Sequence, residues 1–334
     1  TNYPERFSMH TLVTGGAGFI GSNLAEQLLK EEHRVTVLDN LDPYYDLDLK
    51  QYNLDTCRKL TEDRYEFVEG SITDEALVQD LIASRDIDII FHKAAKAGVR
   101  PSVEQPKEYN ANNIGGLLTL LDAAADHGVN RFVNASSSSV YGVPEYLPYD
   151  EEHPNHPKSP YAVTKRSAEH YCNVYDDLHN LPTVNLRYFT VYGPRMRPNM
   201  AISNFVSRCL NDEPPVIYGD GEQTRDFTFV DDVVDANLAL LDTDAADSET
   251  MNIGSSDNIS IRELAEYVVE ETGADVDIVH EESKDADARH THADVSKASD
   301  LIDYEPSVDI RQGVSTFIDW YRENRDWYEP LVRS

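Results

Sequence analysis

A glycine-rich turn between a strand and a helix constrains the fold of this chain more than any other segment. Leu12 to Thr14 reads as the end of a buried strand, Ser22 to Lys30 has a helical pattern, and GGAGFIG joins them at residues 15–21. Glycines permit the tight turn and let the backbone approach a pyrophosphate, while the helix N-terminus favours an anion. The next strand, Arg34 to Leu38, ends in Asp39 at the spacing of a ribose-binding acid. We interpret this unit as a dinucleotide-binding motif rather than a free-standing glycine loop.

The acid that ends the second strand also predicts which dinucleotide is bound. The carboxylate of Asp39 would repel the 2′-phosphate of NADP. Asn40 follows it, where an Arg would have favoured that phosphate. We therefore predict NAD as the cofactor.

Strand-like and helical segments alternate along most of the chain. Beyond the first two strands, further strands are expected at residues 66–68, 87–91, 131–133 and 183–187. This alternation predicts an α/β fold with a doubly wound parallel sheet of the Rossmann type. With 334 residues, the chain also has room for a smaller, discontinuous substrate-binding lobe. We expect an NAD-binding domain over residues 9–189 and about 225–254, and the smaller lobe over about 190–224 and 255–330.

Tyr161 and Lys165 are four residues apart in a predicted helix, so their side chains should lie on one face. Lowering a phenol pKa from about 10 to about 7 needs roughly 4 kcal/mol of preference for the phenolate. A positive charge at about 4 Å supplies roughly that much at an effective dielectric constant of 20. Lys165 and an oxidised nicotinamide would be such charges. The alternative for the pair alone is a packed Tyr beside a solvated Lys.

A cluster of hydroxyl groups stands at the end of an expected strand shortly before the Tyr–Lys helix. Residues 136–139 are all Ser, and the strand-like segment from Arg131 to Asn134 precedes them. A serine-rich linker would not normally begin with such a strand. These hydroxyls could donate to and accept from a sugar oxygen, so the Ser–Tyr–Lys combination predicts hydride chemistry on a sugar.

With these elements in place, the chain resembles the extended short-chain dehydrogenase/reductase family, and within it the nucleotide-sugar epimerases and dehydratases. The resemblance runs from about His10 to about Asn324. Its motifs are TGGAGFIGS, HKAAKAGV, SSSSVYG, YAVTK, RYFTVYGPR and RDFTFVDDV. It implies that Tyr161 is the catalytic base, Lys165 its partner on the nicotinamide ribose, and Ser137 a hydroxyl that binds the substrate.

The resemblance also implies a set of cofactor contacts beyond the catalytic residues. These are Gly15, Gly18, Phe19, Ile20, Gly21, Asp39, Asn40, Ser71, Ile72, Ala94, Ala95, Lys96, Asn112, Tyr161, Lys165 and Phe189. Ser71 departs from the family, which usually has Asp at this position, so the contact with adenine would be weaker or made otherwise.

The implied substrate contacts come from the serine run and from the second half of the chain. They are Ser138, Ser139, Thr190, Arg197, Arg225, Lys284, Asp287 and Thr291. Arg225 matches an arginine that grips the UDP phosphates. Lys284 stands where many members have an Arg, and it keeps the charge but loses the bidentate fork.

Two positions of the serine run predict the reaction. Members that dehydrate at C6 have Asp and Glu where this chain has Ser138 and Ser139, and decarboxylating members carry Glu at the second. Without either carboxylate, we expect epimerisation at C4 of a UDP-hexose through a 4-keto intermediate. UDP-glucose/UDP-galactose and UDP-glucuronate/UDP-galacturonate are both candidate pairs. Arg197 would bind a C6 carboxylate, or else order its loop or hold phosphate.

The size of the sugar pocket leaves a third substrate open. Thr291 stands where members restricted to plain hexoses tend to have a bulky residue. A roomy pocket would admit UDP-N-acetylglucosamine as an alternative substrate. Outside epimerases, a noncatalytic NAD-sensing regulator and a simple NAD-dependent alcohol dehydrogenase remain alternatives.

Composition predicts the surroundings in which the protein works. A formal net charge of −32, from 61 acidic and 29 basic residues, argues against binding to nucleic acid or an anionic membrane. An acidic surface with few lysines is similar to that of proteins from halophilic archaea, where salt screens self-repulsion. Three widely spaced cysteines and the lack of a signal-like or membrane-spanning segment predict a cytoplasmic protein.

Two further expectations concern metal binding and assembly. A metal site could be suggested by Asp287, His290, His292 and Asp294, but their alternation suits a strand near the sugar equally well, and we expect that strand instead. In the resembled family, helices corresponding to residues 106–127 and 161–179 form a four-helix interface. A homodimer is therefore implied by the resemblance.

Overall fold

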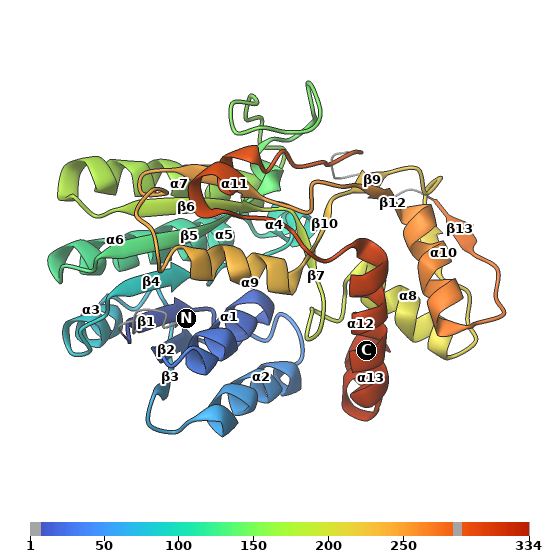
Figure 1. The fold of residues 1–334 in the computed structure, drawn as a ribbon, viewed down its shortest axis with the longest axis horizontal. Coiled ribbons are helices and arrows are strands. Elements are labelled where there is room, and N and C mark those ends of the chain that lie inside the picture. Colours follow the sequence, from blue (N-terminus) through green and yellow to red (C-terminus); the bar gives the residue numbers. More distant parts are fainter. Residues whose placement is uncertain (1–7, 283–288, 334) are drawn as a thin grey trace, which may run out of the picture.

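The computed structural model describes residues 8–282 and 289–333, so the predicted contacts Lys284 and Asp287 lie outside the described residues. A parallel sheet forms its centre (Figure 1). The strands are β1 (His10–Thr14), β2 (Arg34–Asp39), β3 (Tyr65–Glu69), β4 (Ile89–His92), β5 (Arg131–Ser137), β6 (Thr183–Tyr188) and β11 (Thr250–Ile253). They are ordered β11-β6-β5-β4-β1-β2-β3. This confirms the predicted doubly wound sheet.

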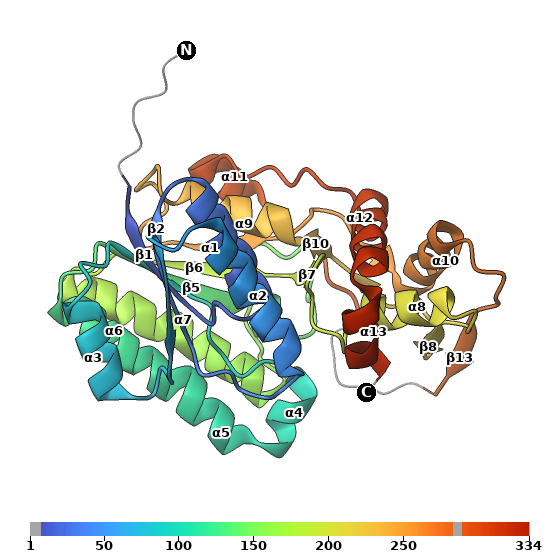
Figure 2. The same cartoon turned by 90° about the horizontal axis from the view of Figure 1, so that it is seen from below.

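Two layers of helices cover the sheet (Figures 1 and 2). One face carries α1 (Phe19–Lys30), α2 (Leu47–Leu60), α9 (Val230–Ala239) and α11 (Ser296–Ile302). The other carries α3 (Glu75–Ala83), α6 (Gly116–Asp126) and α7 (Pro160–His179). Because both faces are covered, β4 and β6 are buried along their whole length.

The order of the strands reverses next to β1. β1, β2 and β3 follow one another from the middle of the sheet to one edge. The chain then returns, and β4 pairs with the other side of β1. Crevices at the carboxyl ends of strands on the two sides of such a reversal are where α/β folds bind ligands. The glycine turn after β1 and the segment after β4 both lie at this edge.

The helix expected over residues 106–127 is divided into three pieces. α5 (Pro106–Asn110) follows the short helix α4 (Val99–Glu104), and a π-helical turn, η1 (Ala111–Gly115), leads into α6. In η1, the Asn113 amide accepts from the Lys96 backbone N–H at 2.8 Å and donates to the Thr164 hydroxyl at 3.1 Å. The wider turn thus ties the segment after β4 to α7.

A smaller lobe lies to one side of the sheet (Figure 2). Its helices are α8 (Ala201–Leu210), α10 (Ile261–Thr272), α12 (Ile310–Glu323) and α13 (Arg325–Arg333). They share an apolar core that includes Phe205, Leu264 and Phe317. Short strands pair as β7 (Thr190–Tyr192) with β10 (Phe227–Phe229), β8 (Val216–Tyr218) with β13 (Val279–Glu281), and β9 (Thr224–Arg225) with β12 (Ile259–Ser260). The exact domain boundaries stay predictions.

The strand expected around residues 290–294 is not formed. The segment makes only isolated bridges, His290 with Thr224 and Ala293 with Tyr149. One reason is that the buried carboxylate of Asp226 accepts the Ala293 backbone N–H at 3.0 Å, a donor that a strand would use for pairing. The alternating residues at 290–294 therefore belong to a segment held partly by the Asp226 side chain and not to a regular strand.

Within the described ranges, no helix combines the length and the apolar character that crossing a bilayer requires.

Candidate active site

A cavity of about 1000 Å³ opens at the carboxyl ends of the sheet strands. Its walls come from the turn after β1, the segment after β4, the end of β5, the start of α7 and the loop after β7. Residues of the smaller lobe, among them Arg225 and Thr291, close the other side. Because both domains line the cavity, it is suited to hold a dinucleotide and a second ligand together.

Most residues predicted to form the site do line this cavity. They are Gly15, Gly18, Phe19, Ile20, Gly21, Asp39, Asn40, Ile72, Ala94, Ala95, Lys96, Asn112, Ser137, Ser138, Ser139, Tyr161, Lys165, Phe189, Thr190, Arg197, Arg225 and Thr291. Ser71 is not part of the lining, and its hydroxyl lies 2.7 Å from that of Thr73. The structure thus brings the predicted residues together, while their individual roles stay predictions.

The glycine turn packs so closely that side chains do not fit at key positions. Gly15 has a φ of +70°, and a Cβ on Gly21 would lie 2.3 Å from the Gly15 carbonyl oxygen. Gly18, the N-cap of α1, provides no side-chain cap, so first-turn N–H groups stay available for an anionic ligand. The turn therefore has the shape and the donors that a pyrophosphate needs.

Asp39 is held in place by its own neighbours and by a lysine from α2. Its carboxylate accepts backbone N–H groups of Ala17 at 3.1 Å and Leu41 at 2.9 Å. The Lys50 ammonium lies 3.2 Å from the same carboxylate, and both side chains are buried. Asp39 and Lys50 therefore form a buried ion pair at this corner of the cavity. The sequence predicted the acid but not its lysine partner.

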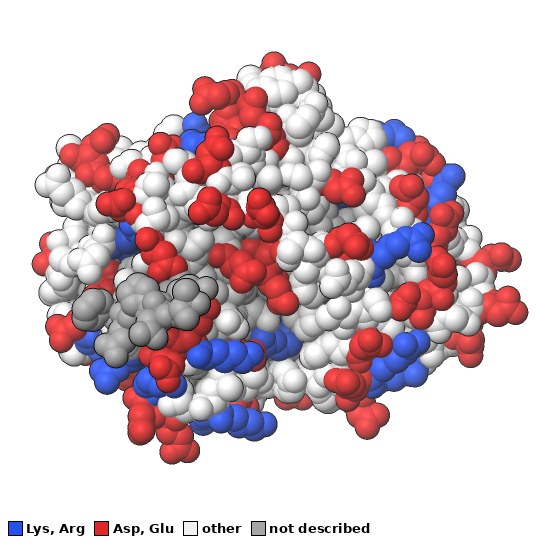
Figure 3. Space-filling view, in the orientation of Figure 1, with Lys and Arg blue, Asp and Glu red and all other residues white. Residues whose placement is uncertain are grey.

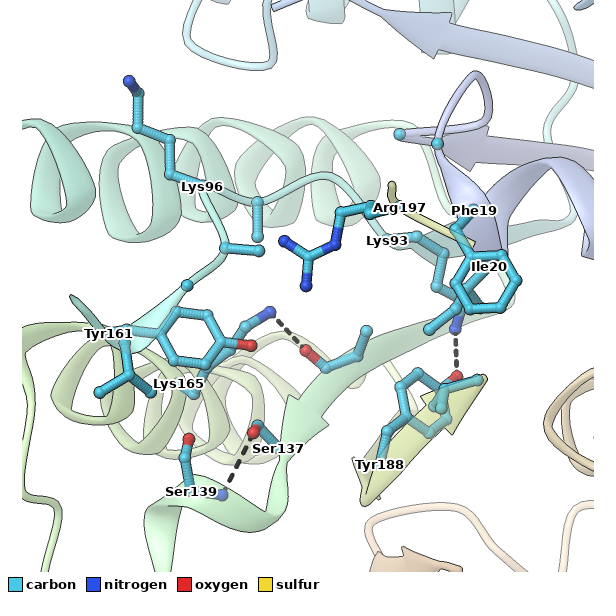
Figure 4. Close-up of a pocket in the computed structure, with 18 of the residues that line it drawn as sticks. Phe19, Ile20, Lys93, Lys96, Ser137, Ser139, Tyr161, Lys165, Tyr188 and Arg197 are labelled. Atoms are coloured by element: carbon cyan, nitrogen blue, oxygen red, sulfur yellow. Dashed lines mark hydrogen bonds between the residues drawn. The ribbon is translucent and has the colours of Figure 1, made fainter. Parts of the chain in front are cut away.

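The Tyr–Lys pair is presented by the first turns of α7. The Ser159 hydroxyl caps this helix by accepting from the Ala162 N–H at 3.1 Å, and Pro160 occupies the first helical position. Tyr161 and Lys165 both face the cavity (Figure 4). The Lys165 ammonium lies 5.9 Å from the centroid of the Tyr161 ring and donates to the Ala135 carbonyl at 2.6 Å.

The electrostatics of Tyr161 are set by burial and by neighbouring groups. Burial raises the pKa of Tyr161 above its ordinary value, and only hydrogen bonding to Ser137 and the charge of Arg197 oppose this. Burial lowers the pKa of Lys165 to about 8, and its ammonium is bound to a carbonyl. That Lys165 and an oxidised nicotinamide lower the phenol pKa stays a prediction, and the Lys165 ammonium lies beside the ring as it requires.

The serine run turns at the end of β5 and presents its hydroxyls to the cavity. The Ser137 Oγ accepts from the Ser139 backbone N–H at 3.1 Å and caps a short helical turn, η2 (Ser138–Val140). The Ser139 Oγ is buried and has no hydrogen-bond partner among the described residues. A buried, unsatisfied hydroxyl beside Tyr161 is suited to a sugar oxygen, since it would otherwise be costly.

A buried charge network fixes α7 against the sheet below the Tyr–Lys pair. Glu169, one turn beyond Lys165, accepts from Arg187 on β6 at 2.8 and 2.9 Å, from the Ser136 hydroxyl at 2.6 Å and from Arg166 at 2.6 Å. Burial by itself raises the pKa of Glu169, but these bonds hold it below the ordinary value. Such paired, fully satisfied groups hold the helix in one position, and with it Lys165.

The far end of the cavity carries the predicted sugar and phosphate contacts. The guanidinium of Arg197 points into the cavity toward Tyr161 (Figure 4) and lies 5.8 Å from the Tyr44 ring. Arg225 donates to the carbonyls of Thr224 at 2.9 Å and Arg289 at 3.1 Å. The Thr291 hydroxyl accepts from the Asp226 backbone N–H at 3.1 Å.

Several residues that line the cavity were not predicted from the sequence. They are Tyr44, Tyr45 and Lys50 from the segment after β2, and Lys93 after β4. Local patterns carry no signal for these contacts, because each depends on how distant elements pack. Only their positions after strands that end at the cavity could have pointed to them.

A Rossmann-type sheet, a glycine-rich turn and a Ser–Tyr–Lys set at one cavity define a short-chain dehydrogenase/reductase of the extended type. The chain belongs to the family described as GDP-mannose 4,6 dehydratase, whose model matches residues 12–317.

Known proteins similar over almost the whole chain include UDP-sugar 4-epimerases. The UDP-glucuronate 4-epimerase of Thermodesulfobacterium geofontis is 38% identical over 314 residues, which are 94% of this chain and 96% of that protein. The crystal structure of UDP-glucuronic acid 4-epimerase from Bacillus cereus, with UDP-glucuronic acid and NAD, matches with a TM-score of 0.88 and 37% identity over 95% of this chain and 100% of that one. UDP-glucose 4-epimerase from Thermotoga maritima, with UDP-glucose, matches with a TM-score of 0.87 and 33% identity over 95% and 100%.

Proposed function

We propose that this protein is an NAD-dependent 4-epimerase of UDP-hexoses, with UDP-glucuronate and UDP-galacturonate as its substrate pair. The observation that carries the choice of substrate is the guanidinium of Arg197, which points into the cavity toward Tyr161 (Figure 4). The relatives from T. geofontis and B. cereus, both UDP-glucuronate 4-epimerases, support it. UDP-glucose and UDP-galactose are the second candidate pair, supported by the T. maritima enzyme.

The residues of the cavity fit NAD. The close-packed turn at Gly15 and Gly21 and the uncapped start of α1 suit the pyrophosphate, and Asp39 suits the adenine ribose. Lys165, fixed by the Ala135 carbonyl, is placed for the nicotinamide ribose. When bound there, NAD would supply the hydride acceptor and donor for C4 of the sugar.

Tyr161 performs the proton transfers of this reaction. Its phenolate accepts the proton of the sugar 4-hydroxyl as C4 loses its hydride, and the phenol gives the proton back when the hydride returns. One proton and one hydride leave and return, so the sugar is neither oxidised nor reduced overall. Ser137, next to Tyr161, donates to the same sugar oxygen and so aligns it.

The serine run supports epimerisation over the reactions of related enzymes. Elimination at C6 needs an added acid and base, and decarboxylating relatives carry a Glu. This chain offers only the hydroxyls of Ser138 and Ser139 at these positions. Among the described residues that line the cavity, Asp39 and Asp42 are the acidic ones, and Asp39 is already paired with Lys50. At these two positions the 4-keto sugar therefore meets hydroxyl groups rather than the carboxylates that elimination or decarboxylation would use.

Arg197 is suited to bind a carboxylate on the sugar. Within the described ranges no carboxylate forms an ion pair with its guanidinium, whose recorded contacts are the Met200 sulfur at 3.8 Å and the Tyr44 ring. Its charge acts on Tyr161, so it lies near the carbon that reacts. The carboxylate carbon C6 is attached to C5, and C5 is bonded to the reacting carbon C4. A cation near the reacting carbon therefore favours a uronic acid over a plain hexose.

Arg197→Ala should weaken the reaction with UDP-glucuronate selectively. We expect kcat/KM for this substrate to fall about ten- to hundredfold, the value of one charge-assisted hydrogen bond of about 1.5–3 kcal/mol. kcat/KM for UDP-glucose should change much less. Arg197→Lys keeps the positive charge but loses the two parallel N–H donors of the guanidinium. Its kcat/KM for UDP-glucuronate should lie between those of the unchanged protein and Arg197→Ala. Equal losses on both sugars would refute carboxylate recognition and favour the UDP-glucose pair.

The pocket around Thr291 should admit a bulky substituent on the sugar. Thr291→Tyr should suppress any activity on UDP-N-acetylglucosamine about tenfold more than activity on UDP-glucose, because the larger side chain overpacks the pocket. Thr291→Val is the matched control, since it removes the hydroxyl that accepts from Asp226 without filling space. Initial rates with both sugars test this, and equal losses would show that Thr291 does not limit the size of the sugar.

We also propose a homodimer formed through α7 and its neighbours. Four apolar side chains on α7 are exposed at helical spacing, Val163 at 51%, Tyr171 at 38%, Val174 at 46% and Leu178 at 72%. Such a stripe on a helix surface is the kind of patch that a second helix covers. The resemblance to the family implies an interface that includes α7, together with the segment of residues 106–127.

We further propose that the protein works in concentrated salt and in a reducing compartment. Acidic side chains are spread over the face of the molecule in Figure 3, in keeping with the net charge of −32. This favours a halophilic source, in which concentrated salt screens the repulsion. The free thiols of Cys57, Cys172 and Cys209 are buried, which supports a reducing compartment such as the cytoplasm.

A further inference from the structure

Asp226 is a buried acid beside the cavity that takes no part in the mechanism. It lies between β9 and β10, directly after Arg225, and its side chain is inaccessible to solvent. Arg225 lines the cavity, and Asp226 is not part of the lining. Successive side chains of an extended segment point to opposite sides. Because the Asp226 side chain is turned into the protein, the side chain of Arg225 faces the cavity.

The carboxylate of Asp226 joins three segments that are far apart in the sequence. Its Oδ1 accepts from the Thr228 hydroxyl at 3.1 Å on β10, and from the backbone N–H and the hydroxyl of Ser255, both at 2.8 Å, just after β11. Its Oδ2 accepts from the backbone N–H of Ala293 at 3.0 Å. One side chain therefore holds together parts of the chain that meet only in the fold.

The backbone of Asp226 contacts two further residues of the cavity wall. Its N–H donates to the Thr291 hydroxyl at 3.1 Å, and its carbonyl accepts from the backbone N–H of Thr190 at 3.0 Å. Thr190 and Thr291 both line the cavity, as Arg225 does. Asp226 thus adjoins three residues that are predicted to contact the substrate, and each of them comes from a different segment.

Close packing leaves the carboxylate little freedom to move. A Cβ on Gly254 would lie 2.4 Å from the Cβ of Ala293 and 3.0 Å from the Oδ2 of Asp226. A buried carboxylate is costly unless it is hydrogen-bonded, and a fully satisfied buried polar group favours one arrangement of its neighbours. The position of residues 291–293 relative to Arg225 is therefore set largely by the Asp226 side chain.

We propose that Asp226 is a positioning residue for the UDP-sugar. It fixes the distance between Arg225, which would hold the UDP phosphates, and Thr291, which would lie beside the sugar. Asp226 does not line the cavity, so it acts through these two residues. The inference rests on the proposed function, because the resemblance to the family assigns the UDP phosphates to Arg225. A purely structural role would instead lower stability without a preference for one ligand.

Asp226→Asn tests this, because it keeps the size of the side chain but turns an N–H donor toward groups that are themselves donors. We expect the Kd for UDP, measured by calorimetry on the NAD-loaded protein at one salt concentration, to rise about ten- to hundredfold. KM for the UDP-sugar should rise by a similar factor. The change in kcat should be much smaller, because binding common to substrate and transition state is lost. The amount of NAD released on denaturation should stay the same.

Asp232 on α9 provides a matched control. Its buried carboxylate accepts from the backbone N–H and the hydroxyl of Ser307, both at 2.9 Å, and from the backbone N–H of Val308 at 3.3 Å. None of these three residues is among the described residues that line the cavity. Asp232→Asn should lower the melting temperature as Asp226→Asn does, but keep the Kd for UDP. An equal loss of UDP affinity in both variants would overturn the proposal, since binding would then follow overall stability.

Gly254→Ala covers the case in which Asp226→Asn does not fold, because it keeps every hydrogen-bonding group and displaces residues 291–293 from the carboxylate. It should show the same selective loss of UDP affinity. Arg225→Ala tests the placement of UDP independently. If its Kd for UDP is normal, UDP does not bind at Arg225, and the inference fails together with that part of the proposed function. If Arg225→Ala weakens UDP binding while the Asp226 and Gly254 variants do not, the inference alone is overturned.

Discussion

Tyr161→Phe is expected to lower the rate of 4-epimerisation by about 10²- to 10⁴-fold while NAD stays bound. The change removes only the proton acceptor, and general base catalysis usually contributes a factor of that size. The ring and its place on α7 are kept, so the cofactor contacts should not change. Turnover by NMR and the NAD released on denaturation measure the two effects separately.

A matched control lies on the same helix. Tyr175 donates its hydroxyl to the Asp122 carboxylate away from the cavity. Tyr175→Phe should therefore leave turnover near normal. Near-normal turnover by Tyr161→Phe itself would remove Tyr161 from the mechanism. Loss of NAD together with activity would mean that its main role is to bind the cofactor.

Lowering the salt concentration should have the second-largest effect. With a net charge of −32, self-repulsion grows as screening weakens, because the Debye length rises from about 3 Å at 1 M salt to about 10 Å at 0.1 M. We expect the melting temperature to fall, and the dimer proposed above to dissociate, below about 1 M salt. Calorimetry and light scattering over this range measure both. An unchanged melting temperature would count against the halophilic interpretation.

The sequence predicts those parts of the fold that depend on short stretches of chain. The glycine turn and Asp39 lie within one strand–helix–strand unit, so their spacing carries the information. Tyr161 and Lys165 lie within one helical turn, and the structure places both at the cavity. In β6, Val184, Leu186 and Tyr188 alternate with polar residues, which is the two-residue period of a strand.

Other features depend on contacts between distant segments, which a single sequence does not reveal. Lys50 reaches Asp39 from α2, and Lys93, just after β4, reaches Asn237 on α9. Arg197 points toward Tyr161 from the loop after β7, and Lys165 bonds to the Ala135 carbonyl on β5. Each of these contacts depends on where the charged end of a long side chain lies in the folded protein.

The π-helical turn η1 and the absence of a strand at residues 290–294 have the same origin. In η1, Asn113 bonds to Lys96 and Thr164, and these tertiary bonds favour the wider turn over a regular helix. At Ala293, the Asp226 carboxylate takes the backbone N–H. Periodicity in the sequence describes the local preference, and these side chains override it.

The most direct test of the account is to follow UDP-glucuronate by NMR with the purified protein in high salt and no added cofactor. We predict that UDP-galacturonate appears until the two epimers reach equilibrium, with no build-up of NADH absorbance. Accumulating NADH would instead indicate a simple alcohol dehydrogenase. No turnover of UDP-glucuronate, UDP-glucose or UDP-N-acetylglucosamine would contradict the account and favour a noncatalytic NAD-sensing regulator.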